Sequence, residues 1–395
     1  MCIRDRRVQL AFAIDQLKRK CPVKGPKLLR FYETMIFEQQ KMMGWEKYNH
    51  HPGNHIFGRV IWNGYMHADG LGAAAHHSVL NTAADPDFLT KNGGWGMTHE
   101  FGHVNQVRPG FKWIGTTEIT NNLYSLWMNY LCNPKGMRLE HQMAPNADGK
   151  SMRGGNMDRY INLSILKHEL WRYTDAGSIN TEKHEIPCGN VFIALAPFWQ
   201  LQLYFTVARG MEDFYPMVFE AARKVAPDTP HGEIQLNFIR SACKAANMNL
   251  ADYFLNVGML CQINRVVGDY GKQSLVIDKE MCRDTLTQII RYPEPDSSVI
   301  HYICVNNVDI YKKKKPVRKA KKYRLKRSGN TVTISPTDCQ NAVAYEAWDG
   351  NKLVRVALRG LNHEDDSTTD LTCPAGTDKI CAVQWDGKRI ILWKK

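Results

Sequence analysis

The stretch GWGMTHEFGHVNQ, residues 94–106, constrains this chain more than any other part of it. It places two histidines four residues apart, with a glutamate directly after the first. Positions i and i+4 lie on one face of an α-helix, so His99 and His103 can offer ring nitrogens to a single ion. Glu100 then projects beside that ion and can accept a proton from a metal-bound water. We therefore interpret the stretch as a metal-binding helix rather than an amphipathic helix with solvated histidines.

A catalytic zinc site also needs a third protein ligand and an open fourth position. Residues 104–117 contain no acid, so Glu118 is the first carboxylate after the motif. Asn122 lies four residues further on, which predicts that it shares a helical face with Glu118 and hydrogen-bonds the outer nitrogen of a ligand histidine. The sequence thus predicts one Zn²⁺ ion, bound by His99, His103 and Glu118.

The motif block also resembles a known family. HEFGHVNQ followed by TEITNN is similar to the enhancin-like, mucin-degrading zinc metallopeptidases of family M60, whose signature is H-E-x-G-H-x-x-Q with a later glutamate. GYMHADG and PFWQLQLYF also match family segments, and the resemblance extends over about residues 25–290. It implies that His99, His103 and Glu118 bind zinc, that Glu100 is the general base and that Gln106 supports them.

The same resemblance implies a fold and a substrate class. It implies a gluzincin fold, an extracellular or cell-surface location, and hydrolysis of peptide bonds in O-glycosylated, mucin-type proteins. The segment DGLGAAAHH departs from the family, where a Gly-Tyr-Pro-like continuation is expected. That departure affects substrate specificity more than catalysis.

Sugar recognition and transition-state stabilisation need further groups. Tryptophans that flank the motif predict an aromatic platform for a sugar ring, although each of them could equally be a core residue: Trp95, Trp113 and Trp127. A neutral donor must also stabilise the tetrahedral oxyanion. Its candidates are tyrosines that we do not rank: Tyr124, Tyr173 and Tyr204.

Hydrophobic patterning outlines the organisation of the chain. Residues 55–80 are typical of short strands separated by glycines, and residues 93–290 are mostly helical. Residues 329–395 alternate like strands, with Asp349-Gly350 and Asp386-Gly387 at predicted hairpin turns. We predict an α+β fold: a zincin-like (gluzincin) metallopeptidase with an N-terminal mixed sheet and a helical C-terminal lobe, followed by a small all-β sandwich-like module. The expected divisions are an N-terminal segment read as a cloning scar plus a truncated domain (1–20), the metallopeptidase domain (21–310), a basic linker (311–328) and the β module (329–395).

Composition excludes several other classes of protein. The most apolar window, residues 191–205, is too short to span a bilayer, so we predict a buried helix and no transmembrane segment.

The run 312–327 holds eleven Lys or Arg and no acid. Such a run could bind nucleic acid or acidic glycans, but a solvated linker is the favoured interpretation, and no nucleic-acid partner is expected.

The eleven cysteines form no C-x-x-C pair. We expect mostly buried thiols, with Cys373 and Cys381 as one candidate pair if the protein is exported.

These features together favour a secreted or surface zinc metallopeptidase, an endopeptidase directed at glycoproteins. It would act by Glu100-assisted attack of a zinc-bound water. The alternative is a non-catalytic glycan-binding or adhesion protein that keeps the peptidase fold. A protein that has lost catalysis has no chemical need for Glu100, which argues against that alternative. The oligomeric state does not follow from the sequence.

Overall fold

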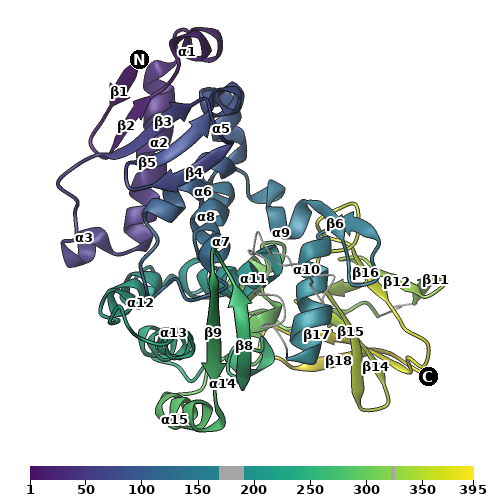
Figure 1. Cartoon of the computed structure of the whole chain (residues 1–395). Coiled ribbons are helices and arrows are strands. Elements are labelled where there is room, and N and C mark those ends of the chain that lie inside the picture. The colour runs from purple at the N-terminus through teal and green to yellow at the C-terminus, as the bar shows by residue number, and fades with distance from the viewer. Residues whose placement is uncertain (169–190, 322–324) are drawn as a thin grey trace. The chain divides into compact units, whose positions relative to one another are not determined.

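The computed structural model describes residues 1–168, 191–321 and 325–395 (Figure 1). The chain forms two compact units. The first comprises Met1–Met137 and Tyr215–Thr229, and the second comprises Arg138–Phe214 and Pro230–Lys395. Helices and sheets occur throughout the described residues, which confirms the predicted α+β class. The four-part division predicted from the sequence stays a prediction.

The first unit contains a five-stranded mixed sheet in the order β1-β2-β3-β5-β4. Its strands are β1 (Cys2–Arg4), β2 (Val8–Ala11), β3 (Ile56–Ile61), β4 (Met66–Asp69) and β5 (Gly72–His76). β2, β3 and β5 run parallel, while β1 and β4 pair antiparallel at the two edges. Alanines 73–75 in β5 are fully buried, and their small side chains allow helices to pack closely on the sheet.

Helices make up the rest of the first unit, and α2 and α6 pack on the sheet. The helices of this unit are α1 (Ile14–Lys20), α2 (Gly25–Met42), α3 (Trp45–Tyr48), η1 (His77–Val79), α4 (Leu80–Ala83), α5 (Pro86–Asn92), α6 (Trp95–Val104), α7 (Thr117–Thr120), α8 (Asn122–Cys132), η2 (Pro134–Gly136) and α12 (Phe214–Arg223). α2 buries Leu28, Tyr32 and Met35 at helical spacing, and these side chains join the core cluster of the sheet. The same cluster contains Phe101 of α6, so the motif helix is anchored on the sheet.

The second unit begins with helices and two short hairpins. Its helices are α9 (Arg138–His141), α10 (Gly155–Arg159), the π-helix η3 (Tyr160–Ser164), η4 (Ile165–Lys167), α11 (Val191–Leu201), the π-helix η6 (Gln202–Ala208), α13 (His231–Ala246), α14 (Ala251–Asn256), α15 (Lys279–Ile289), η7 (Ile300–Tyr302) and α16 (Val308–Lys313). Its hairpins pair β6 (Met143–Pro145) with β7 (Ser151–Arg153), and β8 (Ile263–Gly268) with β9 (Lys272–Ile277).

The apolar window predicted as a buried helix forms α11 and η6. Val191–Ala208 is long and apolar enough to cross a membrane by length and composition alone, and 72% of it is buried inside the fold. A core helix passes the same test, so this feature is weak evidence for a membrane span. Gln200 is fully buried, and its side-chain amide donates to the backbone oxygens of His301 and Ile303. These bonds satisfy a polar group that hydrocarbon would leave unpaired.

Strands make up the C-terminal part of the second unit. They are β10 (Arg318–Lys319), β11 (Lys326–Ser328), β12 (Thr331–Ile334), β13 (Cys339–Gln340), β14 (Ala344–Asp349), β15 (Lys352–Leu358), β16 (Thr369–Thr372), β17 (Lys379–Val383) and β18 (Arg389–Lys394). The main sheet has the order β15-β14-β17-β18, and a smaller one has the order β11-β12-β16. Both predicted hairpins form, with Gly350 and Gly387 at positive φ. Cys373 and Cys381 are buried free thiols, so the candidate disulfide does not form.

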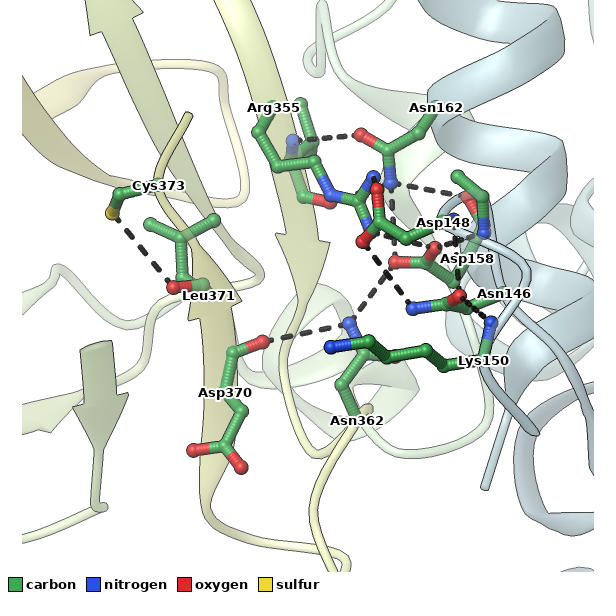
Figure 2. Close-up of polar contacts among 12 residues, drawn as sticks. Asn146, Asp148, Lys150, Asp158, Asn162, Arg355, Asn362, Asp370, Leu371 and Cys373 are labelled. Carbon is green, nitrogen blue, oxygen red and sulfur yellow. Dashed lines mark hydrogen bonds and ion pairs between the residues drawn. The ribbon is translucent and has the colours of Figure 1, made fainter. Parts of the chain in front are cut away.

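A buried polar network joins these strands to the helical part of the same unit (Figure 2). Arg355 of β15 donates to Asp158 of α10 over 2.9 Å, and both side chains are buried. The amide of Asn162 donates to the backbone oxygen of Val356, while its own oxygen accepts from the Val356 N–H. Asn362 also donates to Asp158 over 3.0 Å. The strands are therefore docked on α10 and η3 by paired polar groups as well as by apolar packing.

A second buried acid in this unit gives a test of the fold. Glu140 is fully buried, and its Oε1 accepts from the Trp199 indole N–H (3.3 Å) and the Val305 N–H (3.2 Å). Its Oε2 has no hydrogen-bond partner among the described residues. Burial raises the pKa of Glu140 to about 7. At mildly acidic pH the folded state therefore holds a proton that the unfolded chain has released.

Glu140→Gln is expected to flatten the pH dependence of stability. Because the folded pKa is raised, the stabilisation is complete below about pH 4.5 and is lost as pH rises through about 7. Relative to the variant, the wild type should lose roughly 3 kcal/mol of unfolding free energy over that range. Urea unfolding of both proteins at pH 4.5 and 8 measures this difference. Parallel pH curves for the two proteins would show that Glu140 is ionised in the fold.

Candidate metal centre

The motif lies on α6, as the sequence predicts. Gly93 and Gly94 precede the helix, both at positive φ, and end α5 before α6 begins. The inner face of α6 buries Phe101, which lies against β3 where Gly58 leaves room for its ring. The opposite face carries His99 and His103, whose side chains are 21% and 10% exposed. The sheet core thus fixes the rotation of the helix that presents both imidazoles.

Gly102 explains how the next helices come close enough to complete the site. A Cβ at this position would lie 2.6 Å from the backbone oxygen of Asn121 and 3.2 Å from the ring of Tyr124. Only a glycine therefore allows the junction of α7 and α8 to touch α6 between the two histidines. This contact brings Glu118 and Asn122 to the histidine face.

Three ligand atoms converge there. The Nε2 atoms of His99 and His103 lie 3.1 and 3.3 Å from one carboxylate oxygen of Glu118. An atom of Glu100 also lies within 4.8 Å of the histidine ligand atoms. Glu118 makes the short contacts to both nitrogens, so the geometry agrees with its prediction as the third ligand, and Glu100 lies beside the three groups.

The outer nitrogens of both rings face amide oxygens. His99 Nδ1 lies 2.9 Å from Asn122 Oδ1, and His103 Nδ1 lies 3.4 Å from Gln106 Oε1. Gln106 is itself fixed, because its amide donates to Thr117 O (3.0 Å) and to the Thr120 hydroxyl (2.6 Å). Oxygen acceptors at Nδ1 favour the tautomer whose Nε2 carries a lone pair.

This donor set fits a zinc ion. Two imidazole lone pairs and a carboxylate oxygen face one another, an arrangement that a shared cation stabilises. Ligand atoms about 2.0–2.1 Å from a tetrahedral ion lie roughly 3.3 Å apart. The observed separations of 3.1 and 3.3 Å are close to that value. Two nitrogens and one carboxylate are also the composition of a catalytic rather than a structural zinc site.

Burial and neighbouring charges act in opposite directions on the pKa values of Glu100 and His99. Burial raises the pKa of Glu100, while the charges of His99 and His103 oppose that effect. Burial alone would lower the pKa of His99, but hydrogen bonds to Glu118 and Asn122 and the nearby carboxylates outweigh it, so the pKa is raised. Glu100 is therefore a carboxylate of increased basicity, as a general base requires.

Removing the acceptor of His99 is expected to weaken metal binding. Asn122→Ala leaves the His99 Nδ1–H without its 2.9 Å partner, and the loss should reduce zinc affinity about 10–100-fold. Asn122→Asp keeps an acceptor oxygen at the same place and should stay within a few-fold of the wild type. Competition with a chromogenic chelator measures both affinities. Equal weakening by the two variants would contradict a role for the acceptor.

The other predicted site residues are less well supported. Trp113 is 2% exposed, so its ring has no open face for a sugar. Trp95 and Trp127 are partly buried, and the Trp127 indole donates to Glu38. The platform stays a prediction for these two.

The oxyanion donor also stays a prediction. The ring of Tyr124 packs beside Gly102, and its buried hydroxyl has no partner among the described residues. Tyr204 belongs to the second unit, where its hydroxyl donates to Asp296 over 2.6 Å. Tyr173 lies outside the described residues.

Several residues near the site were not found from the sequence. The amide nitrogen of Asn121 lies 3.1 Å from His103 Nε2, so a metal at that atom would displace this contact. His67 of β4 is close enough for its charge to lower the pKa of Glu100. Outside this cluster, Trp62 and Tyr65 precede β4 in the chain and are 66% and 71% exposed. The two asparagines of TEITNN are visible in the sequence and could have indicated Asn121. The position of His67 depends on how β4 pairs in the sheet, which the sequence does not show.

The fold and the convergent His, His and Glu donors define a metallopeptidase-like centre on an α+β scaffold. A family model described as peptidase M60, enhancin and enhancin-like, matches residues 1–258. The chain belongs to this family, which confirms the resemblance inferred from the motif. Among the curated proteins, none matches this chain.

Solved structures show the same fold. A metallopeptidase in complex with Tn antigen is 22% identical with a TM-score of 0.71, covering 99% of this chain and 72% of that one. A metallopeptidase from Bacteroides thetaiotaomicron is 22% identical with a TM-score of 0.70, covering 99% of this chain and 65% of that one. The M60 catalytic domain of Clostridium perfringens ZmpC, in complex with the sialyl T antigen, is 15% identical with a TM-score of 0.58, covering 98% and 68%. The chain thus spans about two thirds of the length of these proteins.

Proposed function

We propose that this protein is a zinc endopeptidase that hydrolyses peptide bonds in O-glycosylated, mucin-type proteins outside the cell or at its surface. The observation that carries the proposal is the convergence of His99, His103 and Glu118, with Glu100 beside them. Family membership supports a metallopeptidase. Consistent with a zincin-like arrangement, the motif helix packs against a mixed sheet with an antiparallel edge strand.

The residues of the site divide the chemical work. His99, His103 and Glu118 would hold the ion, and Asn122 and Gln106 would keep both imidazoles in the binding tautomer. When bound, zinc would polarise the scissile carbonyl and lower the pKa of water. Glu100 would accept a proton from the attacking water and deliver it to the leaving amine. Its burial favours this transfer by raising its basicity.

The substrate class is inferred from the similar structures. Two of them are complexes with O-glycan antigens, Tn and sialyl T. Exposed aromatic rings suit the apolar faces of sugars, and Trp62 and Tyr65 join Trp95 and Trp127 as candidates for that contact. We therefore infer that an O-glycan on the substrate is required for cleavage.

Mass spectrometry of a matched substrate pair tests this function. A defined mucin-type O-glycopeptide and its bare peptide are incubated with the protein, with and without prior chelation, and again after zinc is restored. We expect cleavage of the glycopeptide alone, its loss on chelation and its recovery with zinc. Cleavage of both peptides would indicate a general peptidase. No cleavage by folded, zinc-loaded protein would favour the alternative, a non-catalytic glycan-binding protein with the same fold.

A further inference from the structure

The charge of this chain is concentrated near its C-terminus. Residues 311–395 contain nineteen Lys or Arg against nine Asp or Glu, whereas residues 1–310 contain 33 against 30. Most of the chain's net charge of +13 therefore belongs to about a fifth of its length.

The run that was favoured as a solvated linker is part of the fold where it is described. β10 pairs with β13, and β11 pairs with β12. Asp338 brings the two basic segments together, since its backbone oxygen accepts from the Ala320 N–H (2.9 Å) and its carboxylate contacts Lys326 (3.3 Å). Lys319 donates to the backbone oxygen of Leu392 over 2.8 Å, which places β10 beside the end of β18.

These pairings define one basic surface. We use this name for exposed cations on the end of α16, on β10 and β11, on the segments that flank β10 and at the end of the chain after Trp393: Lys312, Lys315, Arg318, Lys319, Lys321, Lys326, Arg327, Lys394 and Lys395.

Much of this charge is available to a partner. Lys312, Lys315, Arg318 and Lys321 are exposed and contact no carboxylate in the described part of the chain. The neighbouring acids are already paired, because Asp309 contacts Lys313, Asp296 contacts Lys314 and Asp338 contacts Lys326. Glu346 is fully buried and binds Arg389. These four unpaired cations lie within ten residues of one another on the end of α16, on β10 and on the segments beside it, so they repel one another, and a polyanion would relieve that repulsion.

We propose that the basic surface binds acidic O-glycans, through their sialic acid carboxylates or sulfate esters. The choice of this partner rests on the proposed function, because densely O-glycosylated substrates with acidic sugars are polyanions. The surface would hold such a substrate by charge alone and raise its local concentration near the protein, without specificity for one particular glycan structure.

The composition of the surface favours this partner over nucleic acid. Among the described residues from 291 to 395, the exposed large apolar side chain is Ile391, and the tryptophan rings of Trp348, Trp385 and Trp393 are only partly exposed. Lys314 already covers the Trp385 ring and Lys379 the Trp348 ring, which leaves little open aromatic surface for base stacking. Seven of its nine cations are lysines. A lysine ammonium is a hydrated point charge and lacks the paired N–H donors with which an arginine binds guanine or phosphate. In the described part of the run, Lys312 and Lys313 end the six-residue helix α16 and the other cations lie on strands or connecting segments, so no helix long enough to enter a groove presents the run.

Two matched quadruple variants test the proposal in the full chain. Lys312→Gln, Lys315→Gln, Arg318→Gln and Lys321→Gln together remove four charges from the basic surface. The control removes four exposed charges elsewhere: Lys91→Gln, Lys244→Gln, Lys272→Gln and Lys279→Gln. Both lower the net charge from +13 to +9. Circular dichroism and thermal unfolding confirm that each variant is folded.

Binding is measured by biolayer interferometry on an immobilised sialylated and sulfated mucin, on the same mucin after enzymatic desialylation and chemical desulfation, and on duplex DNA. Measurements are repeated from 50 to 300 mM salt. We expect the wild type to bind the acidic mucin in a salt-sensitive way, the surface variant to bind about tenfold or more weakly, and the control to stay within about threefold. Removal of the acidic groups from the mucin should weaken the wild type to a similar extent.

Other results would overturn the proposal. Equal losses in the two variants would mean that binding follows total charge rather than this surface. Tighter binding to DNA than to the acidic mucin, lost in the surface variant, would assign the surface to nucleic acid. Glycopeptide cleavage by the wild type is measured separately, so a failure of the proposed function is distinguishable from a failure of this inference.

Discussion

Replacing Glu100 with glutamine is expected to lower kcat/KM for glycopeptide hydrolysis by about 10²–10⁴, the usual contribution of a general base. Glutamine has nearly the same shape but cannot accept the proton of the attacking water. The loss should fall mainly on kcat, because the substrate contacts stay in place. Initial rates on a defined O-glycopeptide measure the effect.

Metal content and a control variant make this result specific. The Glu100→Gln protein should keep one equivalent of zinc, measured by inductively coupled plasma mass spectrometry, because its ligands are unchanged. Glu280→Gln, at an exposed position in the second unit, removes the same charge and should leave the rate unaffected. Near-normal turnover by zinc-loaded Glu100→Gln would show that another group is the base, and loss of zinc would show that Glu100 is a ligand.

The clustering of the proposed metal ligands was predictable because its geometry is local. His99 and His103 are one helical turn apart, so their common face follows from the helix alone. Glu118 followed from the absence of other acids in residues 104–117, and Asn122 from its spacing to Glu118. The two Asp-Gly hairpins of the C-terminal strands were predictable for the same reason, since a two-residue turn sets its own strand pairing.

The rest of the site depends on long-range packing that spacing does not show. Asn121 contacts both imidazoles only because Gly102 lets α8 approach α6. His67 influences Glu100 because β4 is the antiparallel edge of the sheet. Trp113 is adjacent to the motif in the sequence but buried in the fold, so closeness along the chain was a poor guide to exposure.

The pair formed by Asp158 and Arg355 is the clearest case of a contact that only the fold reveals, because 197 residues separate its members (Figure 2). Arg355→Met is expected to destabilise the second unit by roughly 3–5 kcal/mol, since it leaves the buried Asp158 carboxylate without its cation. Asp158→Asn should cost less, because the guanidinium of Arg355 keeps a second partner in the partly exposed Asp148 (3.2 Å). Lys352→Met, an exposed substitution on the same strand, should change stability by no more than about 0.5 kcal/mol. Urea unfolding at pH 7 measures all three.

The pH dependence of the Arg355→Met loss identifies its cause. Burial raises the pKa of Asp158, whereas the positive charge of Arg355 lowers it. Removing Arg355 therefore raises that pKa further, so the variant should lose least stability at low pH, where Asp158 is protonated, and most at high pH, where an unpaired carboxylate is buried. Adding Asp158→Asn to Arg355→Met should recover part of the loss at pH 8 and little at pH 4. A loss that is the same at both pH values, with no recovery in the double variant, would mean that Arg355 stabilises the fold through packing of its aliphatic stem rather than through its charge.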